Sequence, residues 1–100
     1  MLRERIEAVA ARTGSEFTPA DRILFDEFKS ALNNGQIRAA EKTSAGEWCV
    51  NTWVKQGILL GFRMGVAVDM SGDSLRFFDK DTYPLRPMTV ADDVRIVPGG

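Results

Sequence analysis

The segment from Asn51 to Met64 constrains the fold most strongly, because its apolar centre contains two glycines four residues apart. Asn51 can cap a helix here, and residues 58–62 are apolar almost all round, which predicts that this helix is the most buried element. Gly57 and Gly61 lie on one helix face, and each costs roughly 1 kcal/mol relative to alanine inside a helix. We therefore expect another stretch of backbone to approach that face closely. A surface that binds a partner is the alternative interpretation of this helix.

A second helix is predicted to begin at a strong N-terminal signal. Thr18 is a favourable N-cap and Pro19 suits the first helical position, while Asp21 places a negative charge near the positive end of the helix dipole. Gly35 can adopt the left-handed conformation that ends such a helix. The apolar side chains between these signals have helical spacing and form one stripe: Leu24, Phe25, Phe28, Ala31 and Leu32.

The start of the chain predicts a third helix. Leu2, Ile6 and Val9 recur at helical spacing within residues 2–13, and Gly14 can end the helix. Charged side chains occupy the other face, so we expect this helix to be amphipathic.

Two short β-hairpins are predicted between and after the helices. Residues 37–42 and 47–50 flank a turn-like run that contains a glycine, which is typical of a hairpin. Residues 66–70 alternate between apolar and other positions, and residues 75–78 resume after the Ser-Gly-Asp turn signal at 71–73.

The rest of the chain is expected to be irregular apart from one strand. Pro84 and Pro87 disfavour a regular helix around them. Residues 94–97 read as a short strand that the run Pro98-Gly99-Gly100 breaks. Without internal repeats, the sequence predicts one α+β domain over residues 1–100, mainly helical, with three helices and one or two short hairpins.

Charge and composition exclude several classes of function. Thirteen Lys and Arg residues balance fourteen Asp and Glu residues evenly along the chain, so neither a nucleic-acid surface nor a membrane surface is expected. The absence of histidine removes the imidazole base and the commonest metal ligand. The N-terminus is charged where a signal peptide would be apolar, and a single cysteine cannot form an internal disulfide. We therefore expect a cytoplasmic protein.

Two groups of residues could take part in catalysis or metal binding. Cys49 lies beside Trp48 in an apolar strand, and we expect a small buried side chain, because no histidine is present to activate a thiol. The acidic residues within 79–81 and 92–93 could supply oxygen ligands to a magnesium ion if they converged in space. Turn formation and solvation are the simpler explanation for both acidic groups.

Arg95 is the candidate binding residue. Most cationic side chains among the apolar segments are expected to be solvated, namely Arg38, Lys42, Arg63, Arg76 and Arg86. Arg95 differs because it lies between Val94 and Ile96, and strand alternation would direct it to the opposite face from both. A guanidinium held on a strand can bind a carboxylate through two parallel hydrogen bonds. A solvated surface charge is the alternative.

Four sequence blocks, in order, resemble the tetrahydrodipicolinate N-succinyltransferases. Residues 32–42 (LNNGQIRAAEK) resemble the pattern L-x-x-G-x-x-R-x-A-E-K of that family. Residues 47–63 (EWCVNTWVKQGILLGFR) resemble its W-x-V-N-x-W-[LV]-K-x-A-[IV]-L-L-x-F-R. Residues 77–80 (FFDK) and 94–98 (VRIVP) resemble its [YF]-F-D-K and [VF]-R-V-V-P elements, whereas residues 1–31 match only in helical character.

The resemblance implies a helical N-terminal domain that precedes a left-handed β-helix of hexapeptide repeats in a homotrimer. It implies transfer of a succinyl group from succinyl-CoA to the amino group of open-chain tetrahydrodipicolinate, on the diaminopimelate route to lysine. In such enzymes CoA lies along the β-helix and the acceptor lies between subunits. Arg95 occupies the position of the arginine that contacts the dicarboxylate substrate.

The β-helix is absent from these 100 residues, which end where the hexapeptide coils of the family would begin. Those coils carry the acyl-CoA groove and the carboxylates near the substrate amine. We therefore expect this domain to contribute no catalytic residue, to bind no metal or cofactor, and to lack transferase activity alone. Its expected partners are the dicarboxylate substrate and the β-helix domain of the same enzyme. The alternative is a stand-alone interaction or oligomerisation module without a catalytic role.

Overall fold

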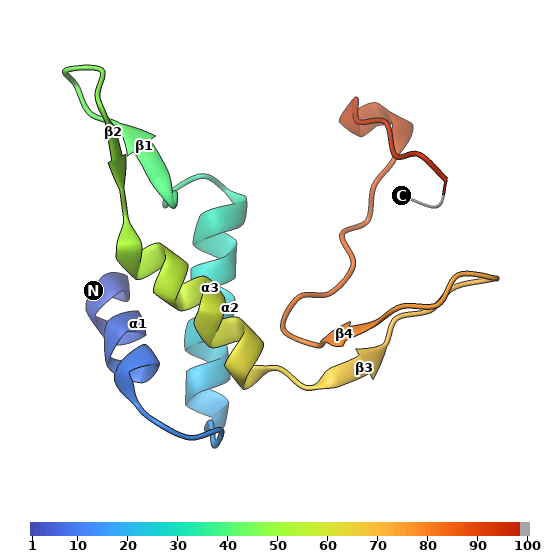
Figure 1. The fold of residues 1–100 in the computed structure, drawn as a ribbon, viewed down its shortest axis with the longest axis horizontal. Helices are drawn as coiled ribbons and strands as arrows, with labels where there is room; N and C mark the ends of the chain where they lie inside the picture. Colours follow the sequence, from blue (N-terminus) through green and yellow to red (C-terminus); the bar gives the residue numbers. More distant parts are fainter. Residues whose placement is uncertain (99–100) are drawn as a thin grey trace.

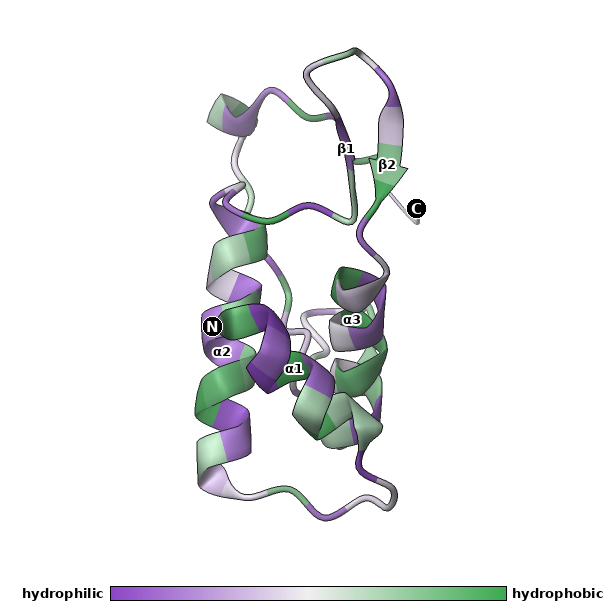
Figure 2. Ribbon diagram, turned by 90° about the vertical axis from the view of Figure 1, so that its left-hand side faces the viewer, coloured by the Kyte–Doolittle hydropathy of each residue, from purple (hydrophilic) through white to green (hydrophobic). Residues whose placement is uncertain are grey.

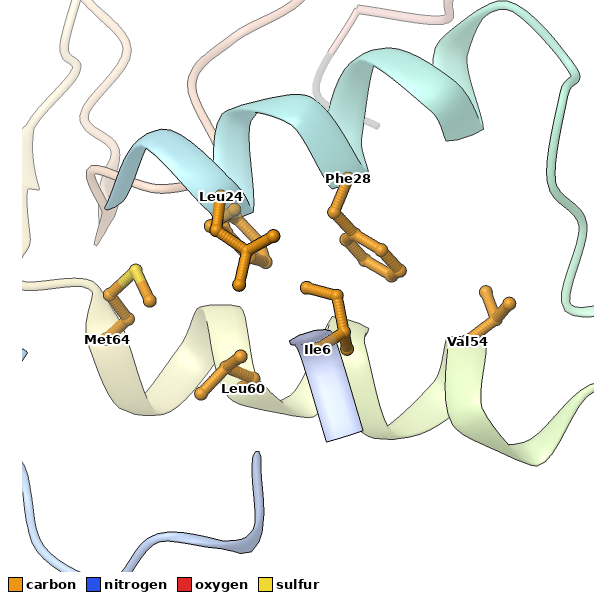
Figure 3. Close-up of a cluster of buried hydrophobic side chains, with 7 residues drawn as sticks. Ile6, Leu24, Phe28, Val54, Leu60 and Met64 are labelled. Atoms are coloured by element: carbon orange, nitrogen blue, oxygen red, sulfur yellow. The ribbon is translucent and has the colours of Figure 1, made fainter. Parts of the chain in front are cut away.

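Three helices form the folded body of the protein, which a computed structural model describes over residues 1–98 (Figure 1). They are α1 (Leu2–Ala11), α2 (Pro19–Asn33) and α3 (Thr52–Met64), as the sequence predicted. Buried side chains from all three helices point toward one another in the core (Figure 3). This core consists of Ile6, Leu24, Phe25, Phe28, Val54, Leu60 and Met64.

Local hydrogen bonds set the start of α2. The Asp21 backbone N–H donates to the Thr18 hydroxyl oxygen at 3.2 Å, and the Thr18 N–H donates to the Asp21 carboxylate at 2.8 Å. These reciprocal bonds form a capping box, so Asp21 has a stronger role than an interaction with the helix dipole alone. After α2, Gly35 has a φ of 80°, which confirms its predicted left-handed conformation.

Aromatic side chains, and not a second backbone, approach the two glycines of α3. A methyl group at Gly57 would overlap the Phe28 ring, and one at Gly61 would overlap the Phe25 ring and the Tyr83 hydroxyl. The expectation of a close backbone was therefore wrong. The large rings from α2 and from the segment after β4 fill the space that the missing Cβ atoms leave.

Helix α3 buries the largest share of its residues, as predicted, but only narrowly. Helices α2 and α3 each bury five residues, and α3 has 13 residues against 15 in α2. On α3, Leu59 is 51% exposed and Phe62 is 46% exposed. A helix that packs against two others still exposes part of its circumference to solvent. A helix with apolar residues on every face is therefore not always fully buried. Its N-cap Asn51 forms no side-chain cap, and its amide instead donates to the Arg38 carbonyl at 2.7 Å.

The first predicted hairpin is present. Strand β1 (Ala40–Lys42) pairs antiparallel with β2 (Trp48–Val50), and Glu41 lies opposite Cys49. Both views show this hairpin extending beyond the ends of the helices (Figures 1 and 2). Trp48 and the other outward side chains of β2 therefore remain exposed.

The second hairpin is present with a shifted second strand. Strand β3 (Ala67–Asp69) pairs antiparallel with β4 (Phe78–Lys80), whereas the sequence predicted a strand over residues 75–78. Between the two strands, an isolated bridge joins Gly72 to Leu75 at the turn. The Phe77 N–H then donates to the Ser71 hydroxyl at 3.0 Å, so β4 begins only after these irregular contacts.

The strand predicted over residues 94–97 does not form. The only regular element among residues 81–98 is one 3-10 turn, η1 (Val90–Asp92). A strand needs a neighbour to accept and donate its backbone hydrogen bonds, and none of the strands in residues 1–98 lies beside this run. The predicted break at Gly99 and Gly100 lies outside the described residues.

The resulting α+β architecture is extended. Its Cα radius of gyration is 16.1 Å, compared with about 13 Å for a compact domain of 100 residues. The two hairpins and the C-terminal segment lead away from the three-helix body, which accounts for the excess (Figure 1). The α+β class with three helices and two short hairpins is confirmed.

Candidate functional site

Arg95 lies in the irregular C-terminal segment and is exposed. It lines a shallow hollow of about 470 Å³ together with apolar neighbours, Val90, Val94, Ile96, Val97 and Pro98. Because no strand forms here, the alternation that would have separated Arg95 from Val94 and Ile96 does not apply. Within residues 1–98, no carboxylate lies within ion-pair distance of its guanidinium. Among the residues that the structure describes, Arg95 is thus a cation without a charged partner, surrounded by exposed apolar side chains.

A hydrogen-bonded turn directs the chain toward Arg95. The Thr89 N–H donates to the Asp92 carboxylate at 2.7 Å, and the Asp92 N–H donates to the Thr89 carbonyl at 3.0 Å. Asp93 then takes a left-handed conformation with a φ of 57°. Asp92 and Asp93 therefore shape the turn before Arg95, which agrees with the simpler interpretation of this acidic pair.

Polar contacts attach the C-terminal segment to the helical body. The Thr82 hydroxyl donates to the Gly61 carbonyl at 2.7 Å, and the Tyr83 hydroxyl donates to the Ile58 carbonyl at 2.5 Å. From α2, Lys29 Nζ donates to the Thr82 carbonyl at 2.6 Å. The attachment point of the segment is consequently fixed on two helices, α2 and α3.

At the same junction, the Asp81 side chain connects the segment after β4 to α2 and to the residues that follow α3. Its carboxylate accepts the Val66 N–H at 2.9 Å and an Arg22 guanidinium N–H at 3.1 Å. The same guanidinium donates to the Met64 carbonyl at 2.9 Å, at the end of α3. The Val66 hydrogen bond, followed by the charge of Arg22, lowers the pKa of Asp81 below its usual value. Asp81 is thus a structural anion.

Asp79, the remaining acidic candidate, lies on β4, and Cys49 lies on β2. Asp79 accepts the backbone N–H of its neighbour Lys80 at 2.7 Å. In the part of the chain that the structure describes, no three acidic or cysteine side chains are placed to hold a metal ion. Cys49 is half-buried on β2, which is less burial than the sequence suggested, because a two-stranded hairpin covers only part of each side chain.

Arg63 has a role that sequence reasoning missed. Its guanidinium donates to the carbonyls of Ala10 at 3.0 Å and Arg12 at 2.6 Å, and lies over the Phe17 ring. It therefore satisfies backbone acceptors at the end of α1 and joins α1 to α3. Nothing in the sequence around Arg63 could predict this contact, because the carbonyls that it binds lie some 50 positions earlier in the chain.

A second feature missed by sequence reasoning is a cleft of about 590 Å³ between α2 and residues 83–87. Lys29 and Arg86 both line it. The only available signal was the polar stripe on α2 at helical spacing, and the sequence alone does not bring residues 83–87 beside that stripe.

No helix among residues 1–98 has the length and apolar character needed to cross a membrane.

Comparison with known proteins agrees with the motif resemblance. Residues 2–64 match the family described as tetrahydrodipicolinate N-succinyltransferase N-terminal. Proteins named 2,3,4,5-tetrahydropyridine-2,6-dicarboxylate N-succinyltransferase are similar to the chain. The one from Delftia acidovorans is 42% identical over 77 residues, which cover 73% of this chain and 28% of that protein. The one from Variovorax paradoxus is 36% identical over 93 residues, covering 88% and 34% respectively.

A relative with the same name from Shewanella baltica is 34% identical over 108 aligned residues, covering 97% of this chain and 38% of that protein. The chain thus spans between 28% and 38% of the length of these three relatives. The family match covers the whole three-helix body and the first hairpin. The chain belongs to the tetrahydrodipicolinate N-succinyltransferase N-terminal family.

Proposed function

We propose that the chain is the N-terminal domain of a succinyl-CoA-dependent tetrahydrodipicolinate N-succinyltransferase, acting in the cytoplasm on the diaminopimelate route to lysine. The observation that carries this proposal is the family match over residues 2–64. The shared name of the relatives supports the reaction class, and their greater length supports a further domain that holds the acyl-CoA. In the proposed enzyme, three copies associate and this domain helps to form the dicarboxylate acceptor site.

Arg95 is the residue proposed to bind a carboxylate of the acceptor. Its guanidinium is exposed and has no ion-pair partner within residues 1–98, so its hydrogen-bonding capacity is available. A planar guanidinium matches a carboxylate through two parallel hydrogen bonds. One arginine can orient a diacid, but it cannot deprotonate an ammonium group. The bond-forming groups therefore belong to the proposed β-helix domain, and the 100-residue chain alone is expected to show no turnover.

The test is kinetic and uses a complete enzyme that carries this domain. Arg95→Ala is expected to raise the KM for the acceptor and to lower kcat/KM, because a charge-assisted hydrogen bond contributes about 1.5–3 kcal/mol. The KM for succinyl-CoA should stay nearly unchanged. Arg76→Ala is the matched control, since Arg76 is also an exposed arginine in the C-terminal part. Unaltered acceptor kinetics in the Arg95 variant would show that the assigned role is wrong.

A stand-alone interaction module is the second candidate function. The extended shape and the exposed apolar side chains of the C-terminal segment favour it, because exposed apolar patches promote association. Sedimentation of the 100-residue chain over a range of concentrations tests it. Reversible self-association is expected for such a module, and a strict monomer that binds no β-helix partner would rule it out.

A further inference from the structure

We propose that the cleft between α2 and residues 83–87 binds a small organic carboxylate at a site separate from Arg95. The cleft has a volume of about 590 Å³, within the range of roughly 300–1,000 Å³ typical of small-molecule sites. It shares no lining residue with the hollow beside Arg95. The proposal therefore does not depend on the proposed transferase function.

The floor of the cleft is a polar face of α2. Asp26, Lys29, Ser30 and Asn33 line it, and their spacing places them on one side of the helix. Lys29 Nζ donates to the Thr82 carbonyl at 2.6 Å and forms an ion pair with Asp26 at 3.6 Å, which is longer than a hydrogen bond. Since an ammonium group has three N–H donors, Lys29 retains donors for a ligand.

The opposite wall is a short segment with limited freedom. The Tyr83 hydroxyl is bonded to the Ile58 carbonyl, which fixes the start of the wall on α3. Pro84 and Pro87 each have a restricted φ, so the wall is largely preformed before a ligand arrives. Between them, the exposed Leu85 supplies apolar surface and Arg86 supplies a second cation.

The balance of donors and charges selects the ligand class. The cleft presents an ammonium, a guanidinium, a hydroxyl and an amide, against a single carboxylate from Asp26. The Asp26 side chain is 72% exposed, so water screens much of its charge. An anion that accepts hydrogen bonds therefore fits the polar floor. The proline and leucine wall favours an anion with an alkyl body, which selects an organic carboxylate over inorganic phosphate.

The experiment is a titration of the 15N-labelled 100-residue chain, followed by the backbone amide signals of α2 and of residues 85–86. The probes are sodium pentanoate, inorganic phosphate and neutral pentanol at equal ionic strength. Pentanoate is expected to shift the signals of Lys29, Ser30, Asn33 and Arg86 with saturation. Phosphate is expected to bind more weakly, and pentanol should cause no saturating shift. Equal binding of phosphate or pentanol overturns the proposed ligand class.

Two variants and two controls test the site itself. Arg86→Gln is expected to weaken pentanoate binding by about tenfold, the loss expected for one charge-assisted contact. Asp26→Asn is expected to strengthen binding, because it removes the only carboxylate of the cleft. Arg76→Gln and Arg95→Gln should leave the dissociation constant unchanged. An unchanged constant in Arg86→Gln, weaker binding in Asp26→Asn, or a loss in Arg95→Gln overturns the proposal.

Discussion

Residues 2–64 contain every buried apolar side chain among residues 1–98, whereas residues 66–98 bury only the side chain of Thr82. The first region is held together by close packing of three helices (Figure 3). The second is attached by hydrogen bonds, one ion pair and the Tyr83 ring, which packs against Phe25 and Phe62. It exposes many apolar side chains: Val66, Val68, Leu75, Phe77, Phe78, Leu85, Val90, Val94, Ile96 and Val97. The first region therefore supplies the core that stabilises the fold, whereas the second presents exposed apolar surface.

The same contrast appears in the first hairpin, where β2 carries hydrophobic positions on a strand that extends beyond the helices (Figure 2). Trp48 and Val50 of β2 are each 69% exposed. Isolated two-stranded hairpins are only marginally stable in water. In the proposed enzyme, contacts with the rest of the protein would cover such surfaces.

The largest expected difference comes from the same substitution made in both regions. Phe28 is fully buried against Gly57 and makes an edge-to-face contact with Trp53, whereas Phe78 on β4 is 68% exposed. Phe28→Ala should lower the free energy of unfolding by about 3–5 kcal/mol. Phe78→Ala should change it by less than about 0.5 kcal/mol. Urea denaturation followed by circular dichroism measures both, and similar losses in the two variants would break the comparison.

A medium effect is expected where the two regions touch. An alanine methyl at Gly61 would overlap the Phe25 ring and the Tyr83 hydroxyl, while Gly72 has open space around it. Overpacking costs about 1–3 kcal/mol, and the better helix propensity of alanine offsets up to about 1 kcal/mol. Gly61→Ala should therefore lower the melting temperature, and Gly72→Ala should leave it almost unchanged. A melting temperature that rises in Gly61→Ala would contradict the packing described for α3.

The smallest expected effect is the response to acid. The pKa of Asp21 is lowered by the Thr18 backbone N–H and by Arg12, and the pKa of Asp81 is lowered by the Val66 N–H and by Arg22. A lowered pKa stabilises the fold above the unfolded value of about 3.9, and this stability is lost as the pH falls through the folded value.

The measurement is the melting temperature between neutral pH and pH values below about 4. Asp81→Asn should show a smaller fall on acidification than the unmodified chain, because one of the carboxylates with a lowered pKa is gone. Asp79→Asn is the control, since Asp79 bonds only the adjacent backbone N–H of Lys80. A protein that becomes more stable on acidification would contradict these pKa directions.

The sequence predicted the first region well because its signals are local. The N-cap Thr18, the apolar stripe of α2 and the left-handed Gly35 each depend on a few neighbouring residues. The nature of the contact at Gly57 and Gly61 could not be predicted, because it depends on rings from elsewhere in the chain.

The second region was predicted less well for the same physical reason. Residues 94–97 have strand-forming side chains, but a strand requires a neighbour, and none is present in residues 1–98. The cleft beside α2 depends on Thr82 and Tyr83 attaching a distant segment to the helices. Arg95 was selected from its neighbours and the motif resemblance, and its role in binding substrate stays a prediction.

The most direct test of the central proposal is a crystal structure of a complete enzyme that carries this domain, soaked with pimelate as a stand-in for the acceptor. The account predicts that one pimelate carboxylate lies within hydrogen-bond distance of the Arg95 guanidinium, in two parallel contacts. Pimelate bound in the acceptor site with both carboxylates away from Arg95 would contradict it.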